Sequence, residues 1–302
     1  AVLVGRKGNV FKPTVSGGYL DLSEIPEEAK YDDLYTLTIK GTDLAGNDQT
    51  ASVEFILNRY GSNVDVTGTN YQGRYLQAPV DVDLEEVTVE ALREDKTDIK
   101  VTLDGAPYSI APALQSTTRT GGDTGDYVYA YHIDKAAFQK EGTYLIQVVS
   151  QTEGGLDQVS RLSYSFVVDS TNPELQVSGI RTDAAYRSES RDFTVTPRDM
   201  TTVTLEAQVD GKTMQLLSDE NGVYTGTLPQ STSAHTVVLK ATDMAGNVTE
   251  TTISDVYVNA STFGQVINWI RHHILATSAA GGILAAAAAL IVLARRRKNA
   301  DN

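Results

Sequence analysis

The sequence contains no cysteine, only eight prolines, one tryptophan, and fewer basic than acidic side chains. The absence of cysteine excludes disulfide-stapled scaffolds and every metal site built from thiolates. With 25 Lys and Arg against 39 Asp and Glu, the formal net charge of -14 argues against nucleic-acid binding, which needs a basic surface. The 302 residues are 41% hydrophobic, which is enough for two or three folded domains and excludes a disordered chain.

Enzymatic motifs are missing as well. The sequence has four histidines and no Gly-x-Ser-x-Gly, His-Glu-x-x-His or phosphate-binding-loop pattern. We therefore expect no catalytic or cofactor-binding residues, no cofactor and no small-molecule substrate in this chain.

Short runs rich in Val, Thr, Ile and Tyr alternate with Gly, Asp and Asn clusters, a pattern typical of antiparallel β structure. The segments from Tyr35 and from His235 align without a gap and share Thr-Asp-x-Ala-Gly-Asn at 42–47 and 242–247. A spacing of two periods of about 100 residues predicts a middle copy, and residues 143–169 repeat its strand, turn and strand order.

Each copy reads as a β-hairpin. In the first, apolar residues at every second position predict one face turned to a core: Leu37, Ile39, Val53, Phe55 and Leu57. Tyr35 and Tyr144 stand where a tyrosine corner is expected, whereas the third copy has His235 at that place.

The shared turn has a complete explanation in turn chemistry, because Asp43 and Asn47 can bond their own backbone and Gly46 supplies a positive φ. The alternative is a calcium site, with Asp43, Asp48 and Asp243 as the candidate ligands. Calcium needs six to eight oxygens, and the spacing matches no EF-hand. For this turn, calcium is the metal that the sequence leaves open. A second alternative is a metal at the adjacent His272 and His273, which we otherwise interpret as polar residues beside the membrane.

Tyr127, Tyr129 and Tyr131 fall on one face of a predicted strand. They either face the core or form an aromatic platform for a sugar or a protein. Four acidic residues lie on a stretch that we expect to be a sheet edge, where charge discourages edge pairing: Asp81, Asp83, Glu85 and Glu86.

Two junction motifs follow the repeats: Asn-Arg-Tyr-Gly at 58–61 and Asp-Ser-Thr-Asn-Pro at 169–173. Together with the Asp-x-Ala-Gly-Asn hairpins, they resemble the bacterial immunoglobulin-like (Ig-like) modules repeated in surface proteins of Gram-positive bacteria. The resemblance covers residues 1 to about 259. It implies an all-β fold of tandem immunoglobulin-like β-sandwiches displayed on the cell surface.

Residues 274–294 contain no ionisable side chain and are long enough to cross a bilayer as a single transmembrane α-helix. Trp269 precedes the segment, and Arg295, Arg296, Arg297 and Lys298 follow it, so these residues are the expected membrane anchor. By the positive-inside rule, the N-terminus is extracellular and the C-terminus cytoplasmic. The expected location is the cell membrane, with the lipid bilayer as partner.

The predicted organisation is the C-terminal part of an Ig-like domain, two further Ig-like domains, a juxtamembrane linker, the helix and a basic tail: 1–58, 59–168, 169–259, 260–273, 274–294 and 295–302. Because the sequence starts without an initiator Met or signal peptide, we expect further domains upstream. The leading hypothesis is a non-enzymatic, membrane-anchored stalk or adhesive array. The alternatives are the spacer and anchor of an enzyme whose catalytic domain lies upstream, and a module in residues 59–168 that binds an extracellular glycan or protein.

Overall fold

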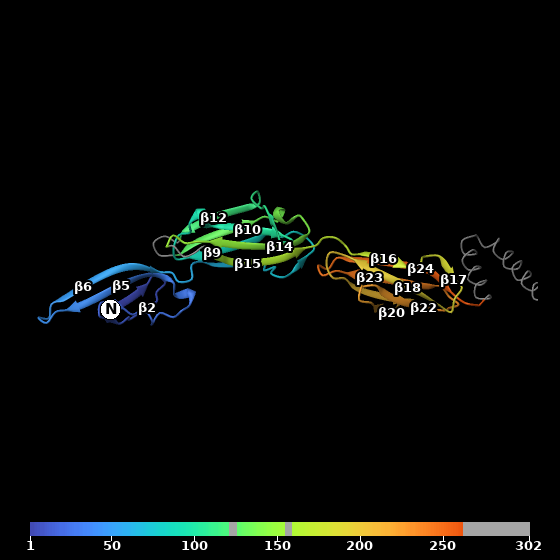
Figure 1. The fold of residues 1–302 in the computed structure, drawn as a ribbon, viewed down its shortest axis with the longest axis horizontal. Helices are drawn as coiled ribbons and strands as arrows, with labels where there is room; N and C mark the ends of the chain where they lie inside the picture. Colours follow the sequence, from blue (N-terminus) through green and yellow to red (C-terminus); the bar gives the residue numbers. More distant parts are fainter. Residues whose placement is uncertain (121–125, 155–158, 262–302) are drawn as a thin grey trace, which may run out of the picture. The chain divides into compact units, whose positions relative to one another are not determined.

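A computed structural model describes residues 1–120, 126–154 and 159–261. Nearly all regular structure in these ranges is β-strand (Figure 1). The helical segments are short 3-10 turns: η1 (Ala29–Tyr31), η2 (Glu94–Lys96) and η4 (Lys135–Phe138). The all-β prediction is therefore confirmed for these residues.

The predicted transmembrane segment 274–294 and its flanking residues lie outside the described residues: Trp269, Arg295, Arg296, Arg297 and Lys298. Within the described ranges, no helix has the length and hydrophobicity needed to cross a bilayer. The chain divides into two compact units, Ala1–Ser170 and Thr171–Asn302.

The first unit begins with an antiparallel sheet in the order β2-β1-β5-β6. Its strands and the small ribbon that follows β2 are β1 (Val2–Gly5), β2 (Val10–Phe11), β3 (Val15–Ser16), β4 (Tyr19–Leu20), β5 (Asp33–Thr42) and β6 (Asp48–Leu57). β5 and β6 pair along their whole length, from Asp33↔Leu57 to Thr42↔Asp48. The hairpin predicted around the first turn motif is thus confirmed.

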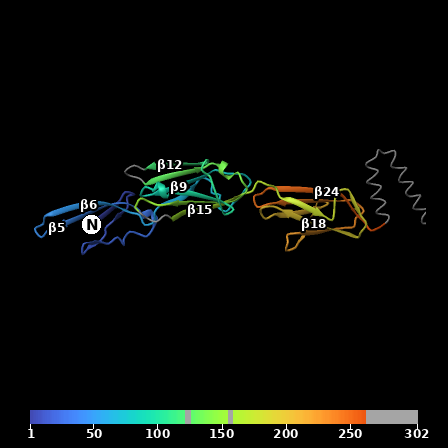
Figure 2. The same cartoon turned by 45° about the horizontal axis from the view of Figure 1, so that its top comes forward.

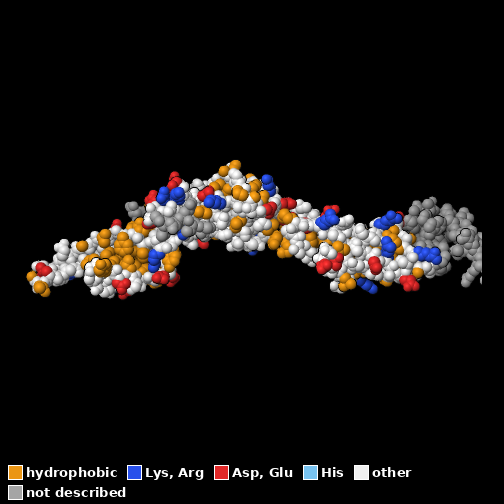
Figure 3. Space-filling model, in the orientation of Figure 1, with side chains coloured by type: hydrophobic (Ala, Val, Ile, Leu, Met, Phe, Trp, Pro, Cys, Tyr) orange, Lys and Arg blue, Asp and Glu red, His pale blue; other side chains and the backbone are white. Residues whose placement is uncertain are grey.

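The core of this sheet lies at one end of the hairpin. Phe55 and Leu57 pack against a buried cluster made of Leu3, Ile25, Tyr35 and Leu37. The prediction that Ile39 and Val53 also face a core is wrong, because 37% and 57% of their surfaces are exposed. The cluster ends at Leu37, so the distal half of the hairpin extends beyond it, and hydrophobic side chains gather on the surface of this sheet (Figure 3).

Two packed sheets, the middle sandwich, complete the first unit (Figure 2). Their orders are β11-β10-β14-β15-β8 and β12-β13-β9-β7. The strands are β7 (Asn63–Thr67), β8 (Tyr75–Leu76), β9 (Val82–Thr88), β10 (Asp98–Leu103), β11 (Ala106–Tyr108), β12 (Leu114–Thr120), β13 (Tyr127–Ile133), β14 (Gly142–Ser150) and β15 (Val159–Val168).

Strict alternation of buried and less buried residues builds the core of the middle sandwich. In β14, Tyr144, Ile146 and Val148 are fully buried, whereas the residues between them are not. Burying such a side chain contributes about 1.5–3 kcal/mol. The acidic stretch that begins at Asp81 is not a sheet edge, since β9 pairs with β13 on one side and with β7 on the other. Asp83 and Glu85 alternate with the inward-facing Val82 and Leu84, whereas Glu86 faces inward itself and is fully buried.

The second unit is a sandwich of sheets β16-β18-β22-β21 and β17-β24-β23-β19-β20. Its strands are β16 (Glu174–Ser178), β17 (Ala184–Tyr186), β18 (Ser190–Arg198), β19 (Thr204–Val209), β20 (Lys212–Met214), β21 (Leu217–Ser218), β22 (Tyr224–Pro229), β23 (His235–Thr242) and β24 (Val248–Val258). Phe193, Val195, Leu228, Val237 and Leu239 are buried between the two sheets.

The middle sandwich and the second unit have the same topology. Strands β7 to β15 correspond one by one to β16 to β24, including the parallel pair at one edge, β8 with β15 and β17 with β24. The first sheet, β2-β1-β5-β6, follows the order β11-β10-β14-β15. The repeat seen in the sequence is therefore also a repeat of strand order.

Candidate functional site

The shared turn motif is held together by its own side chains. In the first copy, the Asn47 backbone N–H donates to Asp43 Oδ1 and its side-chain amide donates to Asp43 Oδ2, both at 2.8 Å. Gly46 has a φ of +86°, which L-residues rarely adopt. The side-chain bond from Asn47, with backbone bonds, lowers the pKa of Asp43. The carboxylate is thus committed to the turn.

The third copy repeats this geometry. Asp243 Oδ1 accepts from the backbone N–H groups of Gly246 and Asn247, at 2.7 and 2.8 Å, and Asp243 Oδ2 accepts from the Asn247 amide at 2.7 Å. Asp48 accepts instead from the Thr42 hydroxyl at 2.6 Å and pairs with Lys40. In the first hairpin, the candidate ligands Asp43 and Asp48 have separate hydrogen-bond partners, and among the described residues neither belongs to a group of three or more potential metal ligands.

The three tyrosines of β13 differ in their surroundings. Tyr131 is 7% exposed and belongs to the core, and the half-buried Tyr129 packs against it. The Tyr129 hydroxyl accepts a hydrogen bond from the Leu92 backbone N–H at 2.9 Å. Tyr127 is also partly exposed, but it is not among the residues of this core. The inward face predicted for the strand is present at Tyr129 and Tyr131.

Beside these two rings lies a cavity of about 270 Å³. Leu92 and Ile99 give it apolar walls, and Glu94 and Asp98 also line it, together with Tyr129 and Tyr131. The cavity joins β13 to β10 and to the segment around η2, which are far apart in the sequence. Periodicity along one strand carries no signal for such a cavity, so sequence reasoning missed it.

Below Tyr131 the sandwich buries a carboxylate. Glu86 is fully buried, and its Oε2 accepts from the Tyr131 hydroxyl at 2.9 Å, while its Oε1 accepts from the hydroxyls of Ser62 and Ser150. Burial, followed by the charge of Glu86, raises the pKa of Tyr131. The hydroxyl of Tyr131 therefore keeps its proton and donates a hydrogen bond to the carboxylate.

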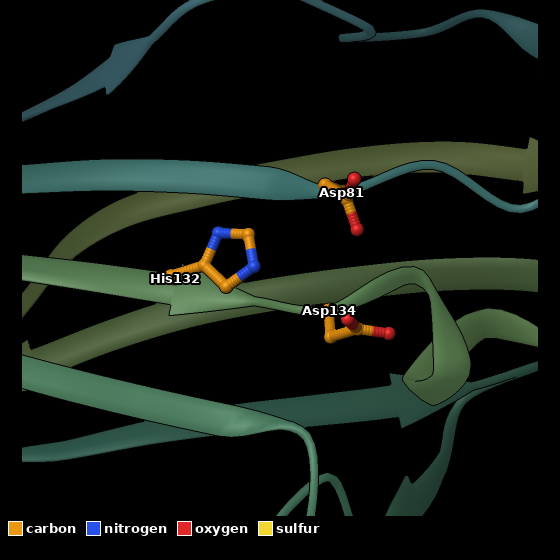
Figure 4. Close-up of side chains that lie close together, drawn as sticks. All are labelled: Asp81, His132 and Asp134. Atoms are coloured by element: carbon orange, nitrogen blue, oxygen red, sulfur yellow. The ribbon is translucent and has the colours of Figure 1, made fainter.

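A second cluster lies on the outside of the same sheet and brings together Asp81, His132 and Asp134 (Figure 4). Each offers one ligand atom, and these atoms lie within 4.8 Å of one another. His132 Nδ1 lies 2.6 Å from Asp83 Oδ1. This hydrogen bond, with the neighbouring carboxylates, raises the pKa of His132. Alternation along β13 places His132 and Asp134 on one face, whereas Asp81 meets them only through the pairing of β9 with β13.

Comparison with known proteins bears on the fold. The family described as Bacterial Ig-like domain matches residues 137–259, from η4 to the end of β24. No curated protein matches the chain. The described residues form an all-β fold with Ig-like sandwiches.

Two solved structures are similar to parts of the chain. The fibronectin(III)-like modules of Clostridium thermocellum CbhA are 14% identical, with 65% of this chain and 94% of that chain covered and a TM-score of 0.30. Rst D1-D2 is 12% identical, with 65% and 100% covered and a TM-score of 0.38.

Proposed function

We propose that this chain is a non-enzymatic cell-surface protein whose Ig-like modules form a stalk or binding array. The observation that carries the proposal is the strand order shared by the middle sandwich and the second unit. Repeated modules with one topology extend a chain and multiply surfaces, and neither task needs a catalytic centre. Asp43, Asp243 and Glu86 make hydrogen bonds that hold the modules themselves.

Membrane anchoring through residues 274–294 is the second part of the proposal. Its support is the uncharged run itself and the basic residues Arg295, Arg296, Arg297 and Lys298 that follow. With this polarity, the modules stand outside the cell and the tail inside.

Protease treatment of intact cells tests both parts. Cells that express the full gene are treated with a protease that cannot cross the membrane, and a matched variant ending after residue 273 is the control. We expect the full chain in the membrane fraction with its modules cleaved from outside, and the shortened chain released into the medium. A full chain that stays soluble, or that is protected from the protease, contradicts the proposal.

The cavity beside Tyr129 and Tyr131 favours a second candidate function, in which the middle sandwich binds an extracellular glycan or a protein side chain. Tyrosine faces with carboxylates close by are suited to sugar hydroxyls. Binding of the purified full chain to a glycan array, compared with the variant Glu94→Gln/Asp98→Asn, tests it. Binding that this variant loses supports the candidate, whereas no binding, or equal binding by the variant, contradicts it.

A further inference from the structure

The cluster of Asp81, His132 and Asp134 stands on firmly paired backbone. Asp81 immediately precedes β9, and Asp134 immediately follows β13. The two strands are neighbours along their full length, with His132 opposite Asp83 and Ile133 opposite Val82. Three side chains from two neighbouring strands therefore meet at one point of the sheet surface, and the ladder between the strands fixes their spacing (Figure 4).

The imidazole of His132 is oriented by Asp83. An ionised carboxylate only accepts hydrogen bonds, so in the 2.6 Å contact the Nδ1–H of His132 donates the hydrogen bond to Asp83 Oδ1. In the neutral ring, Nε2 then carries the lone pair. Figure 4 shows one ring nitrogen of His132 turned to the side on which Asp81 and Asp134 lie. Metal-binding histidines commonly have such a carboxylate behind them, which fixes the tautomer and raises the basicity of the ligand.

The two aspartates are oriented as well. The Lys135 backbone N–H donates to Asp81 Oδ1 at 2.8 Å, and the Ala136 backbone N–H donates to Asp134 Oδ1 at 2.7 Å. Among the described residues, no hydrogen bond to Oδ2 of Asp81 or Asp134 is formed. Each carboxylate is thus held by one oxygen and can offer the other to a cation.

We propose that Asp81, His132 and Asp134 bind a divalent transition metal of the zinc class, with Asp83 as the positioning residue. Bonds of about 2.0–2.2 Å from a tetrahedral zinc place its ligand atoms about 3.4 Å apart, and small side-chain rotations close the present spacing to that value. One imidazole nitrogen with two carboxylate oxygens suits zinc, whereas calcium prefers an all-oxygen shell. Water completes the coordination.

Charge favours the same occupant. Asp81, Asp83 and Asp134 surround the ring, and their charges attract a dication to a site that the neutral imidazole alone would bind weakly. The cluster is separate from the turn motifs and from the cavity, so the proposal does not depend on the proposed function.

Calorimetric titration of the purified, EDTA-treated chain with ZnCl2 tests this site. His272→Gln/His273→Gln serves as the background, because these adjacent histidines offer a competing site in the sequence. In that background we expect one zinc ion per chain and a rise in the melting temperature of the middle sandwich. Calcium chloride should give neither.

Single variants then locate the metal. His132→Gln should abolish binding, and Asp83→Asn should weaken it by about 10- to 100-fold, because the neutral amide oxygen orients the ring less strongly and no longer raises its basicity. Glu85→Gln is the matched control, because it removes a carboxylate from the same strand without touching the cluster, and it should bind zinc like the background. No binding by the background chain, or equal binding by His132→Gln, overturns the proposal.

Discussion

The hydroxyl of Tyr144 donates a hydrogen bond of 2.8 Å to the backbone carbonyl of Lys140, four residues upstream. Tyr35 makes the same bond, also of 2.8 Å, to the carbonyl of Tyr31. Both rings are fully buried. The hydrogen bonds therefore tie the starts of β5 and β14 to the turns that precede them. The tyrosine corners expected at Tyr35 and Tyr144 are therefore present.

Replacing Tyr144 by Phe should destabilise the middle sandwich by about 1 kcal/mol, since the carbonyl of Lys140 loses the hydroxyl that donates to it while the ring packing is kept. Faster hydrogen exchange of the β14 amides would report the change. Tyr75→Phe is the control, because Tyr75 is 39% exposed. Equal exchange in the wild type and in Tyr144→Phe would show that this bond contributes nothing.

Alkaline titration gives a second test at the same residue. Burial raises the pKa of Tyr144 to about 12, whereas in the unfolded chain this group titrates near 10. Because the folded state disfavours the phenolate, the stabilisation is fully present below about pH 10 and is lost as the pH rises through about 12. Subtracting the ultraviolet titration curve of Tyr144→Phe from that of the wild type isolates this group. A midpoint near 10, with the fold intact by circular dichroism, would contradict the expectation.

In the second unit, His235 takes the place of the corner tyrosine. Its Nε2 lies 2.9 Å from the Pro229 carbonyl and its Nδ1 lies 2.8 Å from Asp210 Oδ2, so the ring joins β22 to the turn before β20. We expect His235→Ala to cost about 1–3 kcal/mol, because the buried ring is lost and the Pro229 carbonyl loses its partner, whereas the side chain of Asp210 is 47% exposed and can bond water instead. Hydrogen exchange over residues 190–258 measures this.

The neighbouring substitution Thr236→Ala is the control for His235→Ala. It keeps the backbone N–H that donates to Asp210 Oδ1 at 2.9 Å, so the exchange rates should stay close to those of the wild type. If the two variants behave alike, the ring of His235 is not what joins these segments.

Two glycines of the first hairpin separate backbone strain from side-chain packing. A Cβ on Gly46 or on Gly41 meets no atom within 4 Å, but only Gly46 has a positive φ, +86°. Gly46→Ala should therefore cost about 1–2 kcal/mol. Gly41→Ala should be neutral or slightly stabilising, because alanine restricts the unfolded chain. Thermal unfolding of the first sheet compares them, and equal melting temperatures would argue against strain at the turn.

Local patterns in the sequence predicted the hairpins, the turn chemistry and the tyrosine corners, because each depends on residues a few positions apart. Local patterns did not predict the features that depend on which strands pair. Asp81 meets His132 only through the register of β9 with β13, and the same pairing places the acidic stretch inside a sheet. Alternation identifies the apolar face of a strand but does not show how far along the strand the core extends. For this reason Ile39 and Val53 were predicted to be buried but are exposed.

The short parallel strands have a mechanical consequence. β8 pairs with β15 and β17 with β24, so a strand near the start of each sandwich runs beside its last strand in the same direction. The entry of β8 and the exit of β15 then lie at opposite ends of the pair. Tension that has passed the preceding strand, β7 or β16, pulls the two parallel strands past each other lengthwise, and their hydrogen bonds then resist together instead of opening one after another.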